Sequence, residues 1–131
     1  MQTEIYLDNA ATTRCDEDAL EAMRAALLAD YGNPSSMHRK GYEAEQIWKR
    51  AQKDIAATLS AAPEEIILTS GGTESDNLAL IGAARANARA GLHIITTAIE
   101  HAAIAKTAEA LEDEGFEVTV LPVDARGLVD P

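Results

Sequence analysis

The order of apolar runs and helix-like segments is the feature that most limits how this chain can fold. Apolar runs at 65–69, 93–97 and 116–121 have the length and composition of buried strands. The segments between them have helical periodicity and are rich in good helix formers. Strands that alternate with helices are typical of βαβ units, whose strands lie parallel in one sheet. The sequence therefore predicts an α/β fold with these strands in a parallel sheet.

Helices are expected both before and between these runs. Asp16 is a suitable N-cap for a first helix, and a long helix is predicted over 37–59. Two further helices are predicted, one from Thr73 to near Gly91 and one over 102–114 that is stopped by the next glycine.

The predicted organisation has two parts. Residues 1–36 form an N-terminal arm, a helix and a Gly-Asn-Pro loop, and residues 37–131 form an incomplete large domain. A parallel sheet is normally covered on both faces, and so short a series of strands is small for one. We expect the unfinished sheet to leave an apolar edge that pairs with another chain.

Composition disfavours several classes of protein. The net charge of −11 argues against a nucleic-acid partner, because phosphate contacts need clustered Lys and Arg. The single cysteine, Cys15, cannot form a disulfide framework or a cysteine-rich zinc site, and no metal is expected. The sequence has neither a secretory signal pattern nor a membrane-length apolar run, so we expect a cytoplasmic protein with no membrane partner.

The segment 69–75, Thr-Ser-Gly-Gly-Thr-Glu-Ser, is the most informative local motif. It follows a predicted strand and opens a predicted helix, whose N-terminal N–H groups attract anions. Glycine permits a sharp turn and a close approach of the backbone to a ligand, and the Thr73 hydroxyl adds a donor. The motif predicts a phosphate site or, alternatively, only a helix start capped by Thr73 or Ser75. A P-loop is disfavoured because no Lys follows Gly72, and the Rossmann glycine spacing is absent.

Four motifs in this order resemble those of cysteine desulfurases, which are fold-type-I pyridoxal 5′-phosphate (PLP) enzymes of the class V aminotransferase group. They are LDNAATT at 7–13, GNPSS with a following His at 32–38, TSGGTESDN at 69–77, and Glu-His at 100–101. The resemblance covers essentially the whole chain but only the N-terminal portion of a full-length member. It implies part of a PLP-transferase-like large domain, preceded by the N-terminal arm and helix.

The resemblance also implies roles for individual residues. Gly72 and Thr73 would hold the PLP phosphate, and His101 would stack on the pyridine ring and assist proton transfer. His101 follows the second predicted strand, at the carboxyl edge of the sheet where open α/β folds bind ligands. Without the resemblance, a lone histidine is more often structural. The residues that would lie near the substrate are Ala11, Thr12 and Asn33.

The implied reaction converts L-cysteine to L-alanine and leaves the sulfur as an enzyme persulfide, for an acceptor such as an iron–sulfur scaffold. The Schiff-base lysine and the persulfide cysteine of the family would lie beyond residue 131, and Cys15 is in the wrong place for the latter. Lys106, on the helix that follows His101, is a weak substitute for the missing lysine. We therefore expect this chain alone to be inactive, and to act with a second copy or with a complementing C-terminal chain.

Alternatives remain at this point. The same motifs fit a selenocysteine lyase or another class V aminotransferase, and a non-catalytic fragment could serve as an interaction module. The chain itself is interpreted as a fragment of a larger enzyme, as one half of a split enzyme, or as a short reading frame that has lost catalysis.

Overall fold

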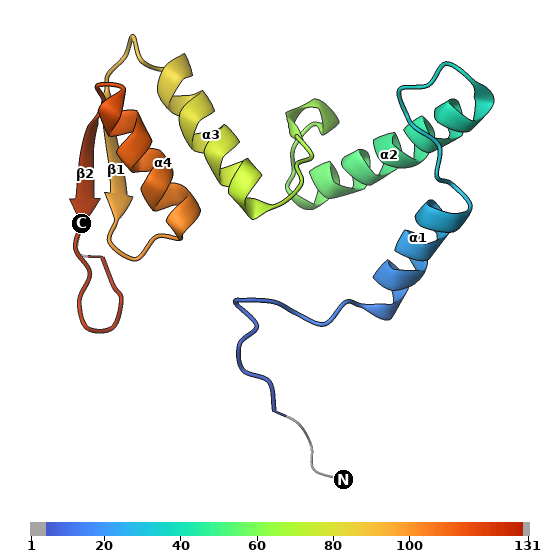
Figure 1. Cartoon of the computed structure of the whole chain (residues 1–131), viewed down its shortest axis with the longest axis horizontal. Coiled ribbons are helices and arrows are strands. Elements are labelled where there is room, and N and C mark those ends of the chain that lie inside the picture. The colour runs from blue at the N-terminus through green and yellow to red at the C-terminus, as the bar shows by residue number, and fades with distance from the viewer. Residues whose placement is uncertain (1–4, 130–131) are drawn as a thin grey trace. The chain divides into compact units, whose positions relative to one another are not determined.

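The computed structural model describes residues 5–129, and Figure 1 shows their elements in chain order. The chain forms two compact units, the first up to Ile67 and the second from Leu68 onward. The domain boundary predicted at residue 36 stays a prediction. Among the described helices, none combines the length and the apolar character that crossing a membrane requires.

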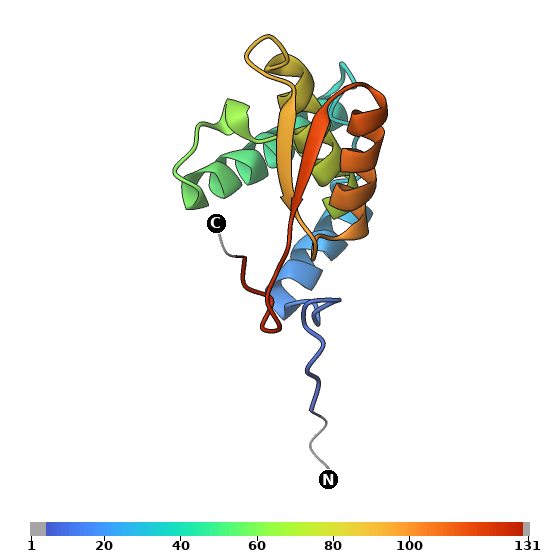
Figure 2. The same cartoon turned by 90° about the vertical axis from the view of Figure 1, so that its left-hand side faces the viewer.

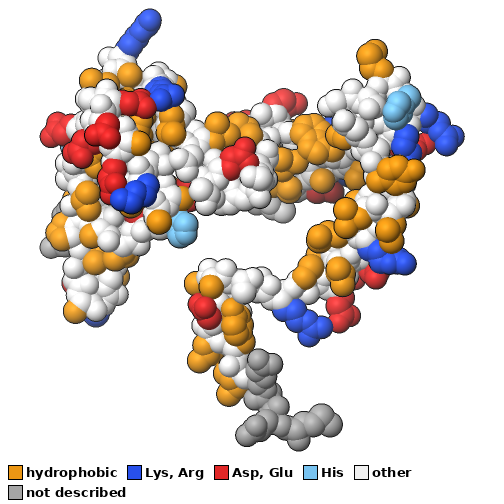
Figure 3. Space-filling view, viewed as in Figure 1, with side chains coloured by type: hydrophobic (Ala, Val, Ile, Leu, Met, Phe, Trp, Pro, Cys, Tyr) orange, Lys and Arg blue, Asp and Glu red, His pale blue; other side chains and the backbone are white. Residues whose placement is uncertain are grey.

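The first unit contains α1 (Glu17–Leu28), α2 (Arg39–Thr58) and the 3-10 turn η1 (Pro63–Glu65). The predicted cap of α1 is confirmed, because the Asp16 side chain accepts hydrogen bonds from the first-turn N–H groups. The long helix is confirmed as α2, with His38 as its N-cap. Large apolar side chains lie open along both helices (Figure 3), among them Leu20, Met23, Leu27, Ile47 and Trp48.

The second unit contains α3 (Gly72–Ala86), β1 (His93–Thr97), α4 (Ala102–Asp113) and β2 (Glu117–Leu121). The strands pair in parallel, in register from one end to the other (Figure 2). The α/β class and the parallel pairing are therefore as the sequence predicts. The predicted stop of α4 is also confirmed, since Gly115 follows it with φ at +99°, a conformation that glycine adopts without strain.

The core of the second unit lies under one face of α4. Leu111 is 1% exposed, and Ala103, Ala108 and Phe116 are buried with it. α4 packs against α3 and against both strands. This packing fixes the start of α4 relative to the start of α3, which is where the phosphate motif lies.

The predicted strand at 65–69 is wrong. Its first residue ends η1, and Ile66 is extended, with φ −94° and ψ 117°. A strand also needs a hydrogen-bonded neighbour, and the sheet formed by the described residues contains only β1 and β2. The predicted end of α3 near Gly91 is also wrong, because the helix stops at Ala86 and residues 87–90 form turns.

Candidate functional site

The glycine-rich motif forms the N-terminus of α3. Gly71 is the N-cap, and no side chain bonds to the N–H groups of the first turn. The N–H of Ser75 donates to the Gly71 carbonyl oxygen at 3.1 Å, so the N–H groups of Gly72, Thr73 and Glu74 have no partner within the helix. The alternative in which Thr73 or Ser75 caps the helix is therefore wrong. The motif presents free backbone donors, as an anion site requires.

The two glycines of the motif are not explained by backbone strain. Gly71 is extended, with φ 163° and ψ 179°, so the expectation that glycine is needed there for a sharp turn is wrong. A Cβ built on Gly71 or on Gly72 would meet no atom of the described chain within 4 Å. The space beside both residues is open, which suits the close approach of a ligand to the backbone.

Glu74 occupies the donors on the preceding side of the motif. Its Oε2 accepts hydrogen bonds from the backbone N–H and from the hydroxyl of Ser70, each at 2.6 Å. The Ser70 hydroxyl bond, followed by the Ser70 backbone bond, lowers the pKa of the Glu74 carboxyl below its ordinary value. Because Ser70 is engaged, the donors left for an anion are the first N–H groups of α3 and the Thr73 hydroxyl.

His101 is the N-cap of α4. Its Nδ1 accepts a hydrogen bond from the N–H of Ala103 at 3.1 Å, so the acceptor nitrogen carries no proton in this arrangement. His101 and Thr73 line the same groove, of about 430 Å³, which runs between α3 and α4. The structure thus brings together two of the residues predicted for the cofactor, one from each helix. The free backbone donors at the start of α3 suit a phosphate, and His101, which lines the groove with Thr73, offers a flat ring.

Lys106 also lines this groove, but its ammonium group has a partner. The Lys106 Nζ donates to Glu109 Oε1 at 2.9 Å and to Oε2 at 2.7 Å. The lysine side chain is 74% exposed. A substitute role for Lys106 would require this local ion pair to open.

Sequence reasoning missed a polar link at the bottom of the groove. The Thr107 hydroxyl on α4 donates to Asn77 Oδ1 on α3 at 2.6 Å. The Asn77 Nδ2 in turn donates to the carbonyl oxygen of Thr73 at 2.8 Å. The sequence contained a signal for this link, because Thr107 falls on the apolar face of the predicted helix. In the structure, Thr107 is only 4% exposed. A buried hydroxyl needs a partner, and here the partner belongs to the helix that carries the phosphate motif.

The residues predicted to lie near the substrate belong to the first unit. Ala11 closes a turn in which its N–H donates to the Asp8 carbonyl oxygen at 3.1 Å, and Thr12 follows it. The Asn33 Oδ1 accepts a hydrogen bond from the Ser35 N–H at 2.9 Å. Ala11, Thr12 and Asn33 are all exposed, and their nearness to a substrate stays a prediction.

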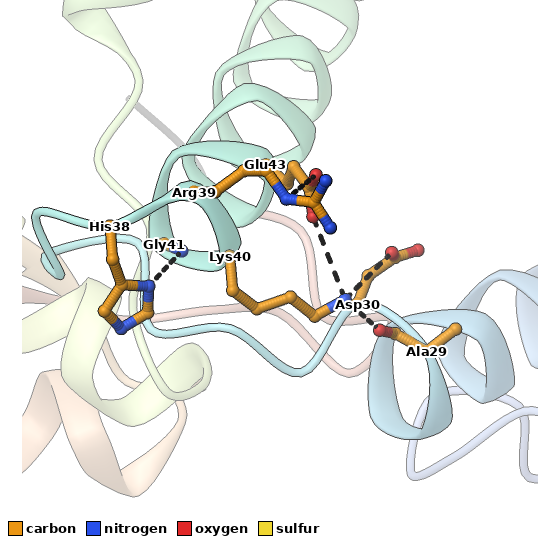
Figure 4. A network of polar contacts seen from close by, with 7 residues as sticks. All are labelled: Ala29, Asp30, His38, Arg39, Lys40, Gly41 and Glu43. Carbon is orange, nitrogen blue, oxygen red and sulfur yellow. Dashed lines mark hydrogen bonds and ion pairs between the residues drawn. The ribbon is translucent and has the colours of Figure 1, made fainter.

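A polar network joins the start of α2 to the residues that follow α1 (Figure 4). The His38 Nδ1 accepts a hydrogen bond from the Gly41 N–H at 3.2 Å, which caps the helix. The Lys40 ammonium donates to the carbonyl oxygen of Ala29 and lies 4.0 Å from the Asp30 carboxylate. His38 therefore has a structural role, as the cap of α2.

Comparison with known proteins gives the family. The family model described as "Aminotransferase class-V" matches residues 5–131. The chain belongs to this family. Class V aminotransferases and the cysteine desulfurases among them depend on PLP, a cofactor that carries a phosphate and a flat ring.

Individual class V relatives agree with this assignment. The chain is 47% identical to the cysteine desulfurase IscS of Dictyoglomus turgidum over 131 residues, which cover 100% of this chain and 33% of the relative. A solved NifS-like protein superposes with a TM-score of 0.88 at 41% identity, over 98% of this chain and 35% of that one. A second, described as SspA in complex with cysteine, has a TM-score of 0.82 at 39% identity, over 92% and 35%. The chain thus spans about a third of the length of the proteins it matches.

Proposed function

We propose that this chain is the phosphate-binding and ring-stacking part of a PLP-dependent cysteine desulfurase. The observation that carries the proposal is the groove that Thr73 and His101 both line, in a chain 47% identical to a cysteine desulfurase. L-cysteine is the proposed substrate, with L-alanine and an enzyme persulfide as products. The solved structure described as SspA in complex with cysteine supports L-cysteine as the substrate.

In this proposal the starts of α3 and α4 have separate tasks. The first N–H groups of α3 and the Thr73 hydroxyl hold the phosphate, and the open space at Gly72 lets the phosphate reach the backbone. The His101 ring lies against the pyridine ring, and its bond to Ala103 through Nδ1 leaves Nε2 as the nitrogen free to move a proton. PLP, when bound, supplies an electron sink for the substrate carbanion.

The rest of the machinery is proposed to come from outside the 131 residues. The cofactor-bearing lysine and the cysteine that accepts sulfur would be supplied by further chain or by a complementing chain. Ala11, Thr12 and Asn33 would approach the substrate in the whole enzyme. The proposed enzyme is a cytoplasmic homodimer that passes sulfur to an acceptor protein such as an iron–sulfur scaffold.

The test is a PLP titration of the purified chain, followed by absorbance, and then by borohydride reduction and mass spectrometry. His101→Asn is the sharpest variant, because asparagine is a good N-cap acceptor and removes only the ring. Thr73→Val removes the hydroxyl at nearly constant volume. His93→Asn is the matched control, since His93 lies on β1, where its Nε2 bonds to the Thr119 hydroxyl at 2.7 Å.

We expect saturable PLP binding that is weakened by His101→Asn and by Thr73→Val but not by His93→Asn. We also expect no covalent adduct after reduction. An adduct confined to Lys106 would mean that its pair with Glu109 opens and that the lysine substitutes for the missing one. Binding that is equal in all four proteins would refute the assignment of the groove.

A further inference from the structure

The hydrogen-bonded link between α4 and α3 ends at the residue proposed to hold the phosphate. Thr107 is buried, and its hydroxyl donates to Asn77 across the helix interface. Asn77 is half-buried and donates onward to the Thr73 carbonyl oxygen, one turn earlier in α3. The link therefore joins the core of α4 to the first turn of α3.

The direction of each hydrogen bond follows from the chemistry of the groups. The Thr73 carbonyl oxygen can only accept, so the asparagine atom that faces it must be the amide nitrogen. The asparagine oxygen then faces Thr107, whose hydroxyl must donate. Asn77 is thus held at both ends of its amide group, and its rotamer is fixed by partners on two helices.

We propose that Asn77 is a positioning residue, which with Thr107 sets where the phosphate donors at Thr73 stand relative to the His101 ring. This inference rests on the proposed PLP site. His101 begins α4, and Thr107 lies on the same helix less than two turns later. A bond from that helix to the first turn of α3 therefore constrains the position of the phosphate site relative to the ring site. A ligand that touches both needs this spacing to be held.

The chain offers two matched controls for this role. Asn87, near the C-terminus of α3, donates through Nδ2 to the Ala83 carbonyl oxygen at 2.8 Å, the same local bond that Asn77 makes with Thr73. The Arg85–Glu114 pair joins the far ends of α3 and α4 at 2.7 Å. Asn87→Ala thus removes the local bond alone, and Glu114→Gln weakens an interhelical contact away from the groove.

The experiment compares PLP affinity and the absorbance spectrum of bound PLP in six variants of the full chain, with urea unfolding measured in parallel. The variants are Asn77→Ala, Thr107→Val, Thr107→Ser, Asn87→Ala, Glu114→Gln and the double variant Asn77→Ala/Thr107→Val. We expect Asn77→Ala and Thr107→Val each to weaken PLP binding about fivefold, the factor of one ordinary hydrogen bond, and to shift the spectrum. Thr107→Ser should restore both, and the double variant should be no weaker than Asn77→Ala alone.

The controls separate positioning from general stability. Asn87→Ala and Glu114→Gln should leave PLP affinity and spectrum unchanged, whatever they do to the unfolding midpoint. If Asn77→Ala binds PLP as the unchanged chain does, or loses affinity only as much as Asn87→Ala, the positioning role is refuted while the proposed site stands. If the unchanged chain does not bind PLP, the proposed function fails, and this inference fails with it.

Discussion

The N-cap bond of His101 is the contact at the candidate site whose energetic contribution can be tested most directly. The Ala103 N–H donates to Nδ1 at 3.1 Å, and Ala103 is only 9% exposed, so water can hardly replace the lost acceptor. Removing an N-cap acceptor costs about 1 kcal/mol. In a unit of this size, that corresponds to a fall in melting temperature of about 4–8 °C.

We therefore expect His101→Ala to lower the stability of the second unit by that amount. His101→Asn should stay close to the unchanged chain, because its side-chain oxygen can accept the same hydrogen bond. The assay is thermal and urea unfolding followed by far-ultraviolet circular dichroism. His93→Ala is the control, since the His93 ring is exposed on β1 and caps no helix.

Two results would overturn this reasoning. If asparagine is as destabilising as alanine, then the packing of the ring, and not the cap, holds the start of α4. If alanine is harmless, the bond contributes nothing, and the His101 ring is not anchored through Nδ1. In the second case the proposal that Nε2 is the free nitrogen would lose its basis.

Two further outcomes follow from the structure. Gly41→Ala should destabilise the first unit by about 2 kcal/mol in urea unfolding, because the new Cβ would lie 2.2 Å from the Ser36 carbonyl oxygen. Gly82→Ala, where a Cβ meets nothing within 4 Å, should instead stabilise α3 slightly, and equal effects would contradict the clash. The pKa of Glu74 is below its ordinary value of 4.5, so its bonds to Ser70 stabilise the fold fully above that pH and less as pH falls through the lowered pKa. The stability difference between the unchanged chain and Glu74→Gln should therefore shrink on acidification, and a constant difference would exclude this contribution.

The elements that were predicted well are those that local sequence determines. Asp16 caps α1 through its own first turn, and Gly115 ends α4 through its own backbone conformation. The strand expected at 65–69 fails for the opposite reason. Its residues are apolar and Ile66 is extended, but a strand exists only where another segment supplies hydrogen bonds. In the described chain, the sheet consists of β1 and β2, and the segment 65–69 pairs with neither.

In the candidate site too, local features could be predicted from the sequence, and contacts between helices could not. Thr73 could be predicted from the glycine-rich motif around it, since it lies in the first turn of its own helix. His101 was proposed only through the resemblance to cysteine desulfurases, and the structure shows it as the N-cap of α4. The motif could not show that both side chains line one groove, because that depends on how α4 packs against α3.

Thr107 shows how such a contact could be sought in a sequence. It stands on a helix face that is otherwise formed by Ala103, Ala108 and Leu111, where a hydroxyl is costly to bury without a partner. Its partner, Asn77, is a poor helix former in the second turn of α3, at a spacing that reaches the Thr73 carbonyl. Each residue alone is only a local exception to helix preference. Two such exceptions on adjacent helices of one motif-bearing unit are better explained by a bond between them, and the 2.6 Å contact is that bond.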